Sequence, residues 1–356
     1  MGYEIDFLAV GDASKSGDAI ALRFGNLYGS RDEQTIVVID GGTQKSGEAL
    51  CSHIQQFYQT DLIDAVISTH PDADHACGLY EVVNNMRVAN LVMHRPWLHT
   101  DEILNLFKNE SLTVGRLEKK IEKSLQHAKN LEELAESKQI KIFEPFAGLT
   151  GFDGTMHVLG PNREYYKGLL PEFRGTPKSL EQMVESALQT VVRKAQEAVE
   201  WVAETIDPST ETLDNTHKKT SAENNSSSII LFNFEGRKVL FTGDAGVDAI
   251  KNALAYSTAS GILLNDLSLI QMPHHGSKHN IDSEILNSLA AKTAMISACA
   301  DGDPKHPSRK VVNALHRRGF KPIATKGNTI RHHNNAPERP NWSAASVLDF
   351  YSQVES

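Results

Sequence analysis

Four short runs of β-branched and other apolar residues each end in an Asp or His side chain, and this pattern constrains the fold most strongly. The runs are Thr35 to Asp40, Leu62 to His70, Lys238 to Asp244, and Leu267 to His275. Their composition is typical of buried strands, and stretches with helical spacing lie between them. Strands that alternate with helices predict an α/β sheet. Because such sheets place ligands at the carboxyl ends of strands, we expect His70 to lie at a binding edge.

The segment that follows the second run contains four candidate metal ligands within six residues. They are His70, Asp72, Asp74 and His75, followed by small residues. Two acids and two histidines on one loop would repel and desolvate each other unless a cation neutralised the carboxylates. The alternation lets positions 70 and 72 serve one cation while 74 and 75 serve a second, roughly 3.5 to 4 Å away. The segment therefore predicts a two-metal site.

Charge and composition exclude several classes of protein. The formal net charge of -9 argues against bulk electrostatic coating of nucleic acid, although Lys292 to Arg339 carries ten Lys and Arg against three acids. That segment could face a polyanion or be an ordinary solvated surface. Three cysteines without C-x-x-C spacing indicate neither a disulfide framework nor a thiolate zinc site. With no apolar run long enough to cross a bilayer and an acidic start, we expect a cytoplasmic protein without a membrane segment.

Two amphipathic stretches interrupt the strand pattern. Apolar residues recur at helical spacing from Leu117 to Leu134 and again from Ser179 to Val202, within segments of about 100–140 and 162–222. We interpret both segments as helical insertions that pack against the sheet layers. The alternative roles are a lid over the site, a homo-oligomer interface or a docking face for a protein partner.

The motifs together resemble the metallo-β-lactamase superfamily. Thr69-His-Pro-Asp-Ala-Asp-His-Ala-Cys-Gly-Leu79 is similar to its His-x-His-x-Asp-His signature, in the variant of the ComEC-type group related to the nuclease domain of DNA-uptake channels. Further segments similar to the group occur along the chain: Phe7 to Gly11 with Gly17-Asp-Ala19, Asp40-Gly-Gly, Asn225 with Ser228, Phe241-Thr-Gly-Asp244, Pro273-His-His-Gly-Ser277, and His306-Pro307. The resemblance implies a four-layer αβ/βα sandwich with helical insertions, formed by residues 1–356 as a single domain.

The resemblance also implies roles for individual residues. His70 and Asp72 would hold one metal, Asp74 and His75 the other, and Asp244 would bridge the two. Either His274 or His275 would complete the second site, and the sequence does not choose between them. Asp40 resembles a buried acid that supports the ligands from behind, and a simple turn residue is its alternative interpretation.

The chain departs from the superfamily at one ligand. Most members supply a further histidine to the first metal from mid-chain, and only His157 and His217 are candidates here. The remaining ligand set is rich in oxygen, which favours harder cations. We expect two divalent ions, with manganese as first choice, zinc as second and magnesium as a third option.

These elements predict a hydrolase that uses a metal-activated water. Asp74 would orient the water, and His306 would bind a phosphate or protonate a leaving group. Substrate contacts are expected from the following polar and basic residues: Asn225, Ser228, Ser277, Lys278, Lys305 and Arg309. The basic segment and the resemblance favour a phosphodiesterase or nuclease acting on nucleic acid or a nucleotide. The alternatives are hydrolysis of a small ester, lactone or lactam, and a partner-regulated or non-catalytic component of a larger complex.

Overall fold

The computed structural model describes residues 1–11, 16–107, 112–174, 176, 200–215, 219–302 and 305–356. Most of the amphipathic stretch predicted from Ser179 to Val202 lies outside these residues, as does His217. Within the described part of the chain, no helix combines the length and the hydropathy that crossing a membrane requires.

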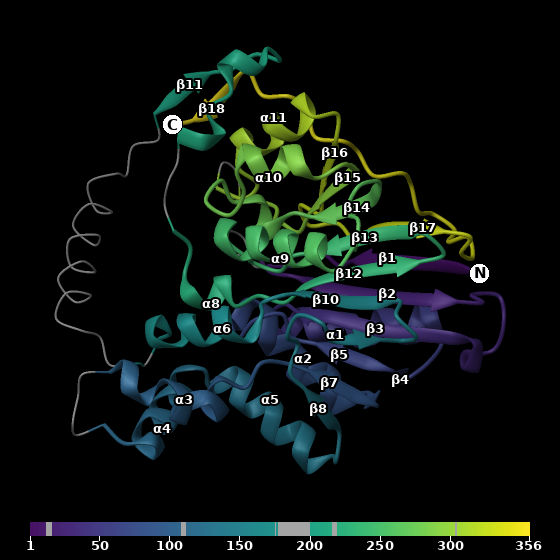
Figure 1. The fold of residues 1–356 in the computed structure, drawn as a ribbon. Coiled ribbons are helices and arrows are strands. Elements are labelled where there is room, and N and C mark those ends of the chain that lie inside the picture. The colour runs from purple at the N-terminus through teal and green to yellow at the C-terminus, as the bar shows by residue number, and fades with distance from the viewer. Residues whose placement is uncertain (12–15, 108–111, 175, 177–199, 216–218, 303–304) are drawn as a thin grey trace.

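Two seven-stranded mixed sheets form the centre of the molecule (Figure 1). The first has the order β17 (Ile330–Asn334), β1 (Gly2–Phe7), β2 (Ala19–Gly25), β3 (Gln34–Gly41), β5 (Ala65–Ile67), β7 (Asn90–Val92) and β8 (Lys141–Phe143). The second has the order β16 (Lys321–Ala324), β15 (Ala291–Ile296), β14 (Leu267–Gln271), β13 (Arg237–Phe241), β12 (Ile229–Phe234), β10 (Met156–Gly160) and β9 (Thr150–Gly151). In each sheet a run of parallel strands, β3 to β8 and β13 to β16, follows antiparallel ones.

The alternation of side chains along each strand creates three apolar interfaces. On β3, Val37 and Ile39 face the space between the sheets, whereas Ile36 and Val38 face the helices outside. A strand buried on both faces reads as a continuous β-branched run, which explains this segment of sequence. Two sheets packed face to face and covered on both outer sides are the four-layer αβ/βα sandwich, so the predicted fold class is confirmed.

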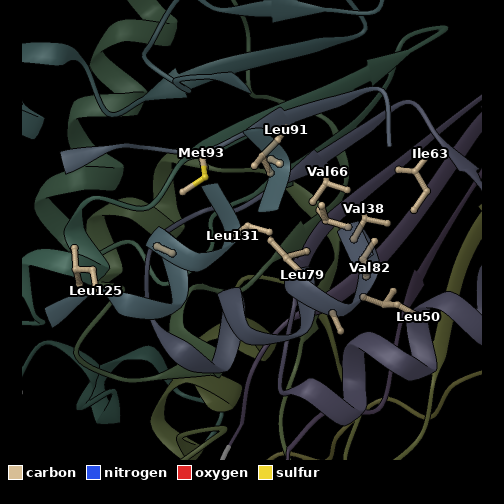
Figure 2. Close-up of a cluster of buried hydrophobic side chains, with 14 of the residues drawn as sticks. Val38, Leu50, Ile63, Val66, Leu79, Val82, Leu91, Met93, Leu125 and Leu131 are labelled. Carbon is tan, nitrogen blue, oxygen red and sulfur yellow. The ribbon is translucent and has the colours of Figure 1, made fainter. Parts of the chain in front are cut away.

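Helices α1 (Gln44–His53), α2 (Ala73–Asn85) and α5 (Gln126–Ser137) cover the first sheet. Figure 2 shows Leu79 and Val82 of α2 and Leu131 of α5 directed toward Val38 and Val66 of the sheet. These side chains are fully buried, and truncating such a leucine to alanine typically costs about 2 to 5 kcal/mol. The second sheet is covered by α9 (Val247–Ala259), α10 (Ser283–Ser288) and α11 (Arg309–Arg317).

Two predicted elements are divided in the structure. The helix expected through Leu117 to Leu134 is two helices, α4 (Val114–Ser124) and α5, with non-helical backbone at Leu125 between them. The strand expected over 62–69 is β4 (Leu62–Ile63) and β5, because the Asp64 carboxylate accepts the Ile36 backbone N–H at 2.7 Å and interrupts the ladder. β4 pairs instead with β6 (Arg87–Val88).

The smaller elements lie at the periphery. They are α3 (Thr100–Ile103), α6 (Arg163–Leu169), α8 (Ala222–Asn225), and a two-stranded sheet of β11 (Trp201–Ala203) with β18 (Gln353–Glu355). α4 and α5 add Leu117, Ile121 and Leu131 to the core outside the first sheet.

Candidate metal centre

The loop after β5 is held against the end of β3 by Asp40. The Asp40 carboxylate accepts the Thr69 backbone N–H at 2.8 Å and the Thr69 hydroxyl at 2.6 Å, and it lies 2.8 Å from His75 Nδ1. This contact at Nδ1 turns Nε2 of the His75 ring toward the other candidate ligands. Asp40 is therefore placed to hold the orientation of the His75 ring.

Helix α2 begins immediately after Asp72, so the motif spans a loop and a first helical turn. His75 is completely buried, whereas Asp74 is half-buried on the side of a cleft. A Cβ on Gly78 would lie 1.9 Å from the Gly41 carbonyl oxygen. Only glycine lets α2 approach the end of β3 this closely, which accounts for Gly78 after the ligand motif.

Asp244 follows β13 and lies among four histidines. Its carboxylate oxygens lie at 3.3 Å from His75 Nε2, 3.6 Å from His274 Nε2, and 3.8 Å from both His70 Nε2 and His275 Nε2. The Asn280 amide donates to the Asp244 carbonyl at 2.9 Å, which fixes the turn. The end of the hairpin predicted from sequence thus meets the loop after β5.

The paired histidines after β14 both approach Asp244, each with left-handed backbone. His274 Nδ1 contacts Asn280 Oδ1 at 3.0 Å, so its Nε2 is directed away from that amide and toward Asp244. His275 is buried, and its two ring nitrogens have no hydrogen-bond partner among the described residues. Both histidines are therefore placed to ligate.

A fifth element contributes Asp18, which sequence reasoning did not propose as a site residue. Asp18 is buried, accepts the Gln271 amide at 2.9 Å, and its other oxygen has no hydrogen-bond partner in the described structure. One ligand-type atom from each of Asp18, His75, Asp244 and His275 lies within 4.8 Å of the others, and Asp40, His70 and His75 form a second such group. The only sequence signal for Asp18 was its place in the Gly17-Asp-Ala19 segment.

Asp72 has a different environment from the other acids. Its carboxylate pairs with the Arg174 guanidinium, whose Nε also donates to buried Glu223 at 3.1 Å. The Arg174 backbone N–H donates to the same Glu223 carboxylate at 2.6 Å. Asp72 belongs to neither of the two groups of converging ligand atoms found in the described residues.

Several ligand atoms at the centre are buried without hydrogen-bond partners in the described residues. They are Nε2 of His70, His75 and His275, and Oδ1 of Asp18 and Asp244. A buried polar atom without a partner costs about 1 to 3 kcal/mol. A divalent cation coordinated by these nitrogen and oxygen atoms would remove that cost, so the donor set fits such an ion.

Electrostatics favour the ligating protonation states of His70, His275 and Asp244, but not those of Asp18 and His75. Burial would lower the pKa of His75, yet the Asp244 and Asp40 carboxylates outweigh it and raise that pKa well above the usual range, so without a cation His75 is held protonated. Burial, together with the neighbouring histidines, holds the pKa of His70 and of His275 well below the usual range, so both are neutral imidazoles near pH 7. Burial raises the pKa of Asp18 to about 7. Burial would also raise the pKa of Asp244, but the nearby histidines, His75 first, outweigh it and keep that pKa well below its usual range.

A cleft of about 780 Å³ opens on the centre. One end carries Asp74, His274, His275 and His306, and the His306 ring lies 5.3 Å from that of His274. Burial and the charge of His274 lower the pKa of His306 to about 4. The other end is lined by the following residues of α2 and α5: Tyr80, Glu81, His127 and Asn130.

The remaining predicted substrate residues are spread around the centre. Ser228 donates through its backbone to the Thr69 carbonyl at 2.9 Å, and Lys278 Nζ donates to the Ser356 carbonyl at 2.6 Å. Lys305 is exposed beside His306, whereas the Arg309 guanidinium lies 4.7 Å from the ring centre of Trp201. The Ser277 backbone N–H donates to the His274 carbonyl, and Asn225 lines a separate pocket. His157, a candidate for the mid-chain metal ligand, lies on β10 outside both ligand groups.

The basic segment predicted to face a polyanion is largely paired within the protein. Arg317 lies 3.1 Å from Glu204 and Arg318 lies 2.9 Å from Glu211. Arg331 and Arg339 both pair with Glu4, which is completely buried. These four arginines neutralise acids from distant parts of the chain, so they do not form a free basic surface.

Comparison with known proteins gives limited matches. No protein-family model matches the chain. ComE operon protein 3 of Bacillus subtilis (strain 168) is 29% identical over 111 residues, covering 30% of this chain and 13% of that protein. This chain therefore corresponds to a small part of that relative.

Solved structures that match the chain share little sequence with it. Tm1679, described as a metal-dependent hydrolase of the β-lactamase superfamily, is 12% identical, with 93% of this chain and 98% of that chain covered and a TM-score of 0.45. Zn²⁺-bound PqqB from Methylobacterium extorquens is 10% identical, with 93% and 99% covered and a TM-score of 0.44. At such identities, residue roles must rest on the geometry of this chain alone.

Proposed function

We propose that this protein is a metal-dependent hydrolase that cleaves phosphodiester bonds with a metal-activated water. The observation that carries the proposal is the convergence of buried, unpartnered ligand atoms from His70, His75, His275, Asp18 and Asp244 beneath an open cleft. Groups of this kind at the base of a cleft are typical of functional sites.

Bound divalent cations would make a water nucleophilic near neutral pH and would stabilise negative charge on the attacked group. The residues of the chain would perform the remaining tasks. Asp244 holds the histidines around one carboxylate, and Asp40 fixes the orientation of the His75 ring. Asp74, on the cleft wall, would accept a hydrogen bond from the water, and neutral His306 would donate one to a phosphoryl oxygen.

The sequence resemblance to the ComEC-type group, which is related to a nuclease domain, supports a phosphodiester rather than another bond. The 111-residue match to ComE operon protein 3 agrees with that resemblance. The mixed nitrogen and oxygen donors suit manganese or zinc, with magnesium as a further candidate. A second candidate function is hydrolysis of an uncharged ester or lactone. It is favoured by the two carboxylates, Asp74 and Glu81, that face the same cleft and would repel anionic substrates.

The test uses metal-free protein supplied separately with manganese, zinc or magnesium. We expect hydrolysis of bis(p-nitrophenyl) phosphate that requires added metal and is lost in His75→Ala, while His157→Ala, outside both ligand groups, remains active. Hydrolysis of p-nitrophenyl acetate or a lactone alone would favour the second candidate. Equal activity of His75→Ala and wild type would overturn the proposed site.

A further inference from the structure

The far end of the cleft differs chemically from the end at the metal centre. Tyr80 and Glu81 reach it from α2, and His127 and Asn130 reach it from α5. On α2, positions 74, 77 and 80 recur at a spacing of three, so one face of the helix runs from the centre to the far end. A molecule whose reacting bond lies at Asp74 would therefore extend toward Tyr80.

Helix α5 is a firm wall for this end. Ala128, Leu131 and Ala135 of α5 are buried in the core outside the first sheet, while His127 and Asn130 are exposed on the adjoining face of the helix. The Gln126 amide donates to Asn130 Oδ1 at 2.7 Å, so the Asn130 NH₂ group is the part directed to a ligand. The helix therefore presents hydrogen-bond donors from a fixed position.

Tyr80 provides a flat apolar surface at the same end. Its side chain remains 39% exposed although the residue lines the cleft. An exposed aromatic face of this kind stacks on planar rings, and stacking of one nucleobase contributes about 1 to 3 kcal/mol.

The charge of the cleft argues against a nucleic-acid strand. Among the described residues that line it, Asp74 and Glu81 are acidic and none is Lys or Arg. A strand brings one negative phosphate per nucleotide and is normally bound by a groove of basic side chains. The volume of about 780 Å³ lies within the range of about 300 to 1,000 Å³ that is usual for small-molecule sites.

On the basis of the proposed function, we infer that the substrate is a small phosphodiester joined to an uncharged, planar heterocycle, of the size of a nucleotide. The heterocycle stacks on Tyr80 and is hydrogen-bonded by Asn130 and His127, while the phosphodiester lies at the metal centre. The carboxylates disfavour additional phosphates.

The kinetic test compares thymidine 5′-(p-nitrophenyl phosphate) with methyl p-nitrophenyl phosphate. We expect Tyr80→Ala to lower kcat/KM for the thymidine diester about tenfold, mainly through KM, and to leave the methyl diester unchanged. Tyr80→Phe keeps the aromatic ring, so its kcat/KM for the thymidine diester should be close to that of the wild type. Tyr28→Ala removes an exposed tyrosine outside the cleft lining and is the matched control. Equal effects of Tyr80→Ala on both diesters, or a higher kcat/KM for a single-stranded oligonucleotide, would overturn the inference.

A binding measurement separates this inference from the proposed reaction. Titration calorimetry with thymidine 5′-monophosphate should give weaker binding to Tyr80→Ala than to wild type, Tyr80→Phe or Tyr28→Ala. If this difference appears without any hydrolysis, the binding of a planar heterocycle at Tyr80 stands and the proposed reaction fails. If Tyr80→Ala binds the nucleotide as tightly as wild type, or wild type does not bind it, the inference fails whatever the protein hydrolyses.

Discussion

His70 and His94 follow the neighbouring parallel strands β5 and β7, yet they enter different environments. Both are buried, and Nε2 of His70 and both ring nitrogens of His94 have no hydrogen-bond partner in the described structure. Near His70 lie His75, with ring centroids 4.2 Å apart, and the Asp244 carboxylate at 3.8 Å. His94 instead stacks on Tyr166 with ring centroids 4.3 Å apart.

The difference shows which buried histidines are candidate ligands. The nearby acid Glu144 is hydrogen-bonded to His99 at 2.9 Å, and the His94 ring packs against the rings of Phe146 and Tyr166. His70 belongs to a group of converging ligand atoms, and His94 belongs to none found among the described residues. A buried imidazole becomes a plausible ligand where carboxylates converge on it, since together they can neutralise a cation.

The largest expected effect is on metal affinity. Asp244→Asn removes the charge around which four histidines gather, so we expect the affinity for manganese and zinc to fall by about 100-fold or more. His94→Phe should leave the affinity within about twofold, because His94 is not placed to ligate. Titration calorimetry measures the metal affinity of both variants. Equal affinities would show that the histidines around Asp244 differ from His94 in no way that matters for metal binding.

A smaller effect concerns the pH dependence of stability. Burial lowers the pKa of His94 to about 3, whereas an unfolded histidine titrates near 6.5. Between these values the unfolded state binds a proton that the folded state does not, so His94 lowers the free energy of unfolding as the pH falls. Replacing it by phenylalanine should remove about 2 kcal/mol of the loss between pH 6.5 and pH 5.

Urea unfolding of wild type and His94→Phe at the two pH values gives this difference directly. Only the change with pH matters, so a uniform cost of packing the larger ring does not affect the result. An unchanged pH dependence in the variant would show that His94 is already charged or paired in the folded protein.

The smallest expected effect concerns Asp72, the motif acid that the fold pairs with arginine. Arg174→Ala removes the half-exposed partner of the Asp72 carboxylate and makes that oxygen available to a cation. A half-exposed ion pair is worth up to about 1 kcal/mol, so a second metal equivalent should bind about fivefold more tightly. Arg163→Ala, which removes another half-exposed ion-paired arginine, is the control. Weaker binding in Arg174→Ala would show that Arg174 supports the centre instead of competing with metal.

The layers and part of the centre were predictable from local sequence. The continuous run of β-branched residues in β3 predicts a strand buried on both faces. The ends of the predicted strands place His70 and Asp244 at the edge where the structure brings them together. Asp18 was not predictable, because its role depends on Gln271 from a strand more than 250 positions away. Long-range pairs are invisible to local patterns.

The same limit explains the basic segment. Its net charge was visible in the sequence, but its partners Glu4, Glu204 and Glu211 lie in other parts of the chain. Counting charges along a segment therefore overestimated the positive surface available to a nucleic acid.

The most direct test of the account is anomalous diffraction from crystals grown with manganese or zinc, collected at the absorption edge of each metal. We expect an anomalous peak among the side chains of Asp18, His75, Asp244 and His275, and none at His94. Crystals that contain the metal elsewhere, with these four side chains surrounding only water, would contradict it.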